Sequence, residues 1–139
     1  LFCEVLKILK DKYSIDTEEC ELKNLSRLQI AQLYSNSDIL LMTSNSEGSP
    51  QAVKEAMCCN LPCVSTPVGD VKILLEGVKD SYVSKKHEAD ELASLVVKSL
   101  KHEGLGITGR EKAIQLELDE NSVANKIYQL YCKVKENNG

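Results

Sequence analysis

The stretch Ser-Asn-Ser-Glu-Gly-Ser-Pro-Gln-Ala-Val-Lys-Glu-Ala-Met, residues 44–57, decides the fold of this chain. It follows a short apolar run at 38–42, as expected for a parallel strand buried on both faces. Gly48 can take backbone angles that other residues resist. Ser49 is a good N-cap, and Pro50 is favoured at the first helical position. The stretch therefore predicts a buried strand, a tight loop and the start of a helix.

The start of this helix, predicted over 49–59, is a candidate site for an anion. The backbone N–H groups of Gln51 and Ala52 have no acceptor within the helix, and the helix dipole favours negative charge there. Two carboxylates bracket the position: Glu47 on the loop and Glu55 on the helix. The sequence therefore predicts an anion site bracketed by two carboxylates.

Apolar periodicity, caps and turn residues predict the remaining elements. Strands are expected at 20–25, 38–42, 63–65 and 81–83, and further helices at 1–12, 26–35, 70–77, 92–100, 109–118 and 119–136. Gly104 and Gly106 are expected to stop the helix at 92–100. Strand and helix alternate from 20 to 101, which predicts an α/β fold. We expect a single domain, 1–139, with a Rossmann-like parallel sheet of about four strands, right-handed crossovers and helices on both faces.

Ligands of such sheets bind outside the carboxyl ends of the strands. This rule brings three predicted loops together, at 24–26, 44–49 and 66–70. The crevice between them is the expected site.

The residues of this crevice resemble a known family. Glu47-Gly48 followed by Glu55-Ala56, and then the segments 60–65 and 68–70, are similar to the group 1 (family four) retaining glycosyltransferases. The similarity covers the chain from about Glu21 to its C-terminus. It implies the C-terminal nucleotide-sugar-binding domain of the GT-B fold.

The resemblance also implies roles for single residues. Glu55 would hold the ribose hydroxyls of a nucleotide-diphosphate sugar, and Glu47 would contact the donor sugar as the catalytic residue. The other donor-binding residues implied are Gly48, Ser49, Gln51, Ala52, Asn24, Thr66 and Gly69. Asn24 belongs to the loop expected to take the base.

The resemblance implies a metal-independent, cofactor-free hexosyltransferase that moves a glycosyl group, with retention, from a UDP- or GDP-sugar to an acceptor hydroxyl. The acceptor would be a glycan or lipid-linked sugar in polysaccharide, lipopolysaccharide or glycolipid synthesis. The N-terminal acceptor domain, the start of this domain and its diphosphate-binding Arg and Lys are expected to lie outside the chain, so the isolated fragment should be inactive. A cytoplasmic location is expected, with peripheral membrane association through the missing part.

Composition fits these expectations. A net charge of −4 and a pI near 5.3 argue against a nucleic-acid partner, which would need a basic face. The six cysteines lack the paired spacing of a zinc site, and only two histidines are present. Small apolar packing in a reducing compartment is therefore expected for the cysteines.

Several alternatives remain open at this stage. Glu55 could be a solvated helix residue, Glu47 a plain loop acid, and Asp70 only a cap, while Thr66 and Gly69 could be turn residues. The chain has Ser49-Pro50 where many family members have an aromatic residue and a glycine. Another GT-B enzyme, such as a nucleotide-sugar epimerase or a phosphorylase, and a non-catalytic Rossmann-like interaction module are the rival functions.

Overall fold

The computed structural model describes residues 1–137 and contains a three-stranded parallel sheet in the order β1-β2-β3. The strands are β1 (Leu40–Met42), β2 (Cys63–Ser65) and β3 (Tyr82–Val83). Leu41 of β1 lies opposite Val64 of β2, and Val64 lies opposite Tyr82 of β3. The predicted parallel α/β fold is confirmed.

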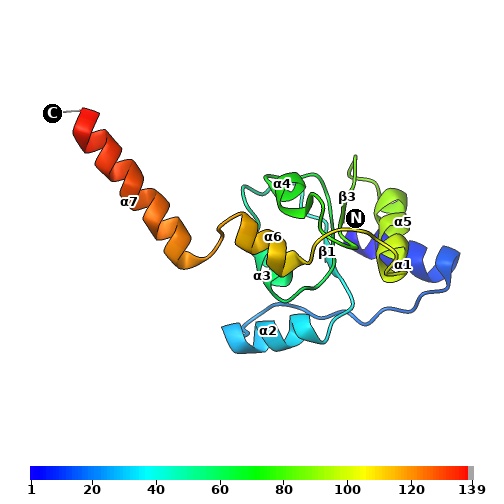
Figure 1. Cartoon of the computed structure of the whole chain (residues 1–139). Coiled ribbons are helices and arrows are strands. Elements are labelled where there is room, and N and C mark those ends of the chain that lie inside the picture. Colours follow the sequence, from blue (N-terminus) through cyan, green and yellow to red (C-terminus); the bar gives the residue numbers. More distant parts are fainter. Residues whose placement is uncertain (138–139) are drawn as a thin grey trace.

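Seven helices surround or extend from this sheet in the described part of the chain (Figure 1). They are α1 (Phe2–Tyr13), α2 (Arg27–Ser35), α3 (Gln51–Cys58), α4 (Val71–Leu75), α5 (Ala89–Leu100), α6 (Gly109–Gln115) and α7 (Glu120–Asn137). None of the helices in residues 1–137 combines the length and the apolar character needed to cross a membrane.

Alternation along the strands creates two cores, because successive side chains point to opposite faces of a sheet. Cys63 packs with the apolar residues of α3 and α4 on one face. Val64 packs with Val5 of α1 and Leu92 of α5 on the other. Helices therefore cover both faces, as predicted, and the strand exits lie between these two layers.

The predicted strand at 20–25 is wrong, and the sheet has three strands in the described residues rather than about four. Most of this segment is exposed, and Asn24 has a left-handed φ of 55°. A strand needs a partner for its backbone, and no backbone hydrogen bond joins this segment to the sheet. Only Cys20 and Leu22 are apolar within 20–24, and both side chains are exposed.

β1 is an edge strand and is only partly buried, which corrects the expectation of full burial on both faces. Leu40 and Leu41 are half-buried, whereas all three residues of the central strand β2 are buried. The strand that is buried on both faces, as is typical of parallel sheets, is therefore β2.

The predicted cap of the motif helix is also wrong. α3 begins at Gln51, Pro50 occupies its N-cap with a φ of −67°, and no side chain caps it. Ser49 lies one residue before the N-cap, and its hydroxyl bonds to Asp70 instead of to the helix. By contrast, Ser26 caps α2 with its side chain, and Gln29 completes a reciprocal capping box.

Three other boundaries differ from prediction. The helix expected at 70–77 is the short α4, and the helix expected at 109–118 ends at Gln115. α5 begins at Ala89, three residues before the expected start, and ends at Leu100 as expected, with Lys101 rather than either glycine as its C-cap. Gly106 instead allows close chain approach, since a Cβ there would come within 2.3 Å of the Gly77 carbonyl oxygen.

α7 extends away from the body of the domain, as Figure 1 shows. Its apolar side chains at Val123, Ile127 and Leu130 are 43%, 51% and 63% exposed. The final helix expected at 119–136 corresponds to α7, and this apolar stripe has no partner among the described residues.

The cysteines do not share one environment. Cys63 is buried, and its burial raises the pKa of the thiol to about 12. Cys3, Cys20 and Cys58 are exposed, so the prediction of apolar packing is wrong for these three.

Candidate functional site

The loops that follow β1 and β2 lie against each other, as their place at the carboxyl edge of the sheet predicts. The backbone N–H of Thr66 donates to the Met42 carbonyl at 3.0 Å, which continues the β1–β2 pairing beyond the strands. The Thr66 hydroxyl then donates to the Ser44 carbonyl at 2.7 Å. Thr66 is fully buried, so its side chain holds the two loops together rather than facing a ligand.

Gly69 allows the closest approach between these loops. Its φ is +50°, and a Cβ there would lie 2.0 Å from the Gly48 carbonyl oxygen and 2.7 Å from that of Glu47. The next residue, Asp70, donates its backbone N–H to the same Gly48 carbonyl at 3.1 Å. The loop at 66–70 thus fixes the path of the Glu47-Gly48 backbone.

A side-chain pair completes this contact. The Ser49 hydroxyl donates to Oδ2 of Asp70 at 2.5 Å. Oδ1 of Asp70 is buried, and no donor among the described residues reaches it. Asp70 occupies the N-cap of α4 without capping it through its side chain, which corrects the expectation of a simple cap.

Glu47 and the first turn of α3 face outward from this clamped pair of loops. Glu47 is exposed, and the Ser44 hydroxyl donates to its carboxylate at 3.0 Å. No backbone acceptor within residues 1–137 is paired with the N–H groups of Gln51 and Ala52. Gly48 has open space where a Cβ would point. The arrangement therefore offers a carboxylate for hydroxyl groups next to free N–H donors for an anion.

Glu55 lies further along α3 and is half-buried near Tyr34 of α2. Burial, together with the negative charge of Glu55, raises the pKa of Tyr34 to about 12. The Tyr34 hydroxyl is buried, and the described residues offer it no partner. No sequence pattern predicts this proximity, which depends on how α2 packs on α3.

The structure removes the basis for placing Asn24 in the site. That expectation depended on a strand at 20–25, whose exit loop would join the other two, and no such strand forms. No hydrogen bond links 24–26 to the loops at 44–49 or 66–70. The remaining expected residues stay together around the strand exits and the start of α3.

The charge at this site is negative in the described chain. Glu47, Glu55 and Asp70 contribute carboxylates, and none of them forms an ion pair within residues 1–137. Lys54 is half-buried and Lys72 is exposed. No group of three or more metal-ligating side chains occurs among the described residues.

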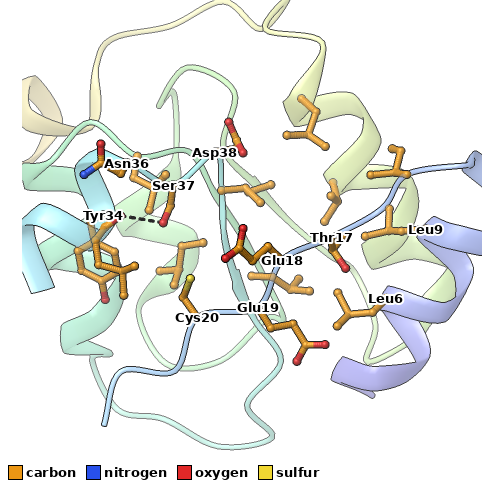
Figure 2. Close-up of a pocket in the computed structure, with 18 of the residues that line it drawn as sticks. Leu6, Leu9, Thr17, Glu18, Glu19, Cys20, Tyr34, Asn36, Ser37 and Asp38 are labelled. Carbon is orange, nitrogen blue, oxygen red and sulfur yellow. Dashed lines mark hydrogen bonds between the residues drawn. The ribbon is translucent and has the colours of Figure 1, made fainter. Parts of the chain in front are cut away.

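A separate cavity of about 520 Å³ lies away from the strand exits, between α1, the segment 15–22 and the edge of β1 (Figure 2). Apolar side chains such as Leu6 and Leu9 line it, with the carboxylates of Glu18, Glu19 and Asp38 around them. None of the residues predicted for the site lines this cavity.

The fold and the loop cluster define a Rossmann-like α/β domain whose candidate site lies at the carboxyl edge of a parallel sheet. Residues 9–102 match the family described as "Glycosyl transferases group 1", and the chain belongs to this family.

Two curated relatives agree with this assignment. The chain is 25% identical over 127 residues to the N-acetyl-alpha-D-glucosaminyl L-malate synthase of Bacillus anthracis, covering 88% of this chain and 32% of the relative. It is 31% identical over 117 residues to the N,N'-diacetylbacillosaminyl-diphospho-undecaprenol alpha-1,3-N-acetylgalactosaminyltransferase of Campylobacter jejuni subsp. jejuni serotype O:2 (strain ATCC 700819 / NCTC 11168). That match covers 81% of this chain and 30% of the relative. The chain thus spans about a third of the length of these relatives.

A solved structure shows the same fold. Sucrose-phosphate synthase (tll1590) from Thermosynechococcus elongatus superposes with a TM-score of 0.72 at 21% sequence identity. The match covers 94% of this chain and 33% of that protein. The described α/β fold is accordingly that of part of a GT-B glycosyltransferase.

Proposed function

We propose that this chain is the donor-binding part of a retaining glycosyltransferase and binds a nucleotide-diphosphate sugar. In this proposal Glu55 accepts hydrogen bonds from the ribose hydroxyls, and Glu47 contacts the donor sugar. The backbone N–H groups after Gly48 bind the diphosphate. The observation that carries the proposal is that the exposed Glu47 carboxylate and the free N–H groups at the start of α3 occur at the same loop–helix junction.

The charge of the site supports a ligand with many hydroxyl groups. Carboxylates accept hydrogen bonds from hydroxyls well, and the helix start offsets part of a phosphate charge. A full diphosphate needs more positive charge than α3 and Lys54 offer. We propose that basic residues of the part absent from this chain supply it, so that donor binding by this chain alone is weak.

Transfer in the proposed enzyme occurs with retention and without a bound metal. Stabilisation of the departing diphosphate by N–H groups and basic side chains lowers the barrier, because charge develops on it in the transition state. The departing phosphate assists the acceptor hydroxyl in a front-face displacement. A glycan or lipid-linked sugar is the proposed acceptor, and association with a membrane surface occurs through the absent part.

Product analysis with a full-length protein containing this chain tests the proposal. The protein is incubated with UDP- and GDP-linked sugars and a lipid-linked sugar acceptor, with and without EDTA. We expect a product whose anomeric configuration, measured by NMR, matches that of the donor, at the same rate in both conditions. An inverted product would contradict retention, loss of activity in EDTA would contradict metal independence, and an epimerised nucleotide sugar would favour the epimerase alternative.

A further inference from the structure

The contact between Ser49 and Asp70 has a role that the family assignment does not supply. We propose that Asp70 is a positioning residue of the donor site. Its carboxylate holds the Ser49 hydroxyl and so fixes the backbone just ahead of α3, where the free N–H groups face the diphosphate. This inference rests on the proposed function. It adds the residue that fixes the geometry of the N–H groups proposed to bind the diphosphate.

The first argument is the hydrogen-bond partner of the Asp70 side chain. Asp70 occupies the N-cap of α4, where a carboxylate commonly accepts a bond from the helix and stabilises it. Its side chain makes no such bond and instead reaches Ser49, which is 21 residues away in sequence. The carboxylate therefore links two loops instead of capping its own helix.

The cost of this arrangement is the second argument. Oδ1 of Asp70 is buried with no donor among the described residues, and a buried unpaired acceptor is unfavourable. Hydrogen bonds to a carboxylate acceptor are shorter and stronger than neutral ones, which favours the bond that Oδ2 makes. The short Ser49–Asp70 distance agrees with a bond of this kind.

The third argument is mechanical. Ser49 is joined directly to Pro50, which is buried and whose ring fixes φ near its observed −67°. Because Pro50 is the N-cap of α3, little rotational freedom separates Ser49 from the first turn. The orientation of Ser49 therefore constrains the orientation of that turn. The backbone bond from Asp70 to the Gly48 carbonyl fixes the other side of the same loop. Loss of the side-chain bond should therefore loosen the start of α3 without unfolding the sheet.

The test uses Ser49→Ala, Asp70→Ala, Asp70→Asn and the double alanine variant of this chain. Thr108→Ala is the matched control, because it removes a hydroxyl that accepts the backbone N–H of Glu111 at the start of α6, outside the site. Ser49→Ala is the decisive variant, since replacing Asp70 by alanine also removes a negative charge near the anion. Asp70→Asn keeps an oxygen that accepts from Ser49 and reports on that charge.

Two measurements are made on each variant. Hydrogen exchange at the backbone N–H of residue 70, which bonds to Gly48, reports on the loop contact. Calorimetric titration with UDP and UMP, and with GDP and GMP, gives the preference for the diphosphate over the monophosphate. A merely structural residue would change melting temperature without changing this preference.

We expect Ser49→Ala to speed this exchange by about ten- to a hundredfold, as for the loss of a hydrogen bond to a charged group. The diphosphate preference should fall about tenfold, the double alanine variant should exchange no faster than either single variant, and Asp70→Asn should retain most of the protection. Thr108→Ala should leave both values unchanged. Wild-type exchange and preference in Ser49→Ala would overturn the inference alone, whereas a wild-type chain that binds none of these nucleotides would overturn the proposed function and this role with it.

Discussion

Gly69 lies so close to Gly48 that a Cβ on Gly69 would come within 2.0 Å of the Gly48 carbonyl oxygen. The atom in the way is backbone, so it cannot move aside as the end of a flexible side chain can. This contact makes the loops after β1 and β2 one unit. The position of Glu47 therefore depends on a residue more than twenty positions later in the chain.

Gly69→Ala should lower the free energy of unfolding by more than the left-handed backbone angle at this position alone would cost. A left-handed φ costs a non-glycine residue about 1–2 kcal/mol, and the clash with Gly48 adds to that cost. Gly77→Ala is the matched control, since Gly77 has a φ of +73° but open space around it. Urea unfolding measures both variants, and equal losses would show that the loops do not need this close contact.

Tyr34→Phe should make the domain more resistant to alkaline pH. Burial raises the pKa of Tyr34 to about 12 from an ordinary value of 10.0, so the folded state keeps the proton longer than the unfolded state. The contribution of protonated Tyr34 to folding stability is therefore fully present below pH 10 and is lost as the pH rises toward 12.

The phenylalanine variant should recover about 1–2 kcal/mol of unfolding free energy near pH 12 and differ little at pH 7. Urea unfolding across this range measures the difference. Because the hydroxyl has no partner in the described residues, its removal should not weaken the core. Identical pH slopes for the two proteins would contradict the assigned cause.

Glu47→Gln, made in the full-length protein, should separate sugar recognition from nucleotide recognition. The glutamine keeps an oxygen for the Ser44 hydroxyl, so the loop should hold its shape. Nucleoside diphosphate affinity should stay near the wild-type value, while turnover falls by about a hundredfold because contacts to the sugar matter most as charge develops. Wild-type turnover would remove Glu47 from the site, and lost nucleotide binding would assign it to the nucleotide instead.

The elements that the sequence predicted well are those whose signals are local. The helix expected at 26–35 is α2, whose cap is Ser26, and the short run at 63–65 is the central strand. The segment 20–25 was mispredicted because a strand depends on a neighbour that no local pattern reports. The Ser49–Asp70 bond could not be predicted either, since it joins residues with strong local capping preferences that both go unused.

The central claim is that α3 of this chain binds the nucleotide of a sugar donor through Glu55. Calorimetric titration of UDP and GDP into the wild-type chain and Glu55→Ala tests it most directly, with the exposed Glu76→Ala as a control for loss of charge. Loss of a hydrogen bond to a carboxylate costs about 1.5–3 kcal/mol, so Glu55→Ala should bind about ten- to a hundredfold more weakly while Glu76→Ala binds normally. Equal affinity of a well-folded Glu55→Ala variant and the wild type would contradict the claim.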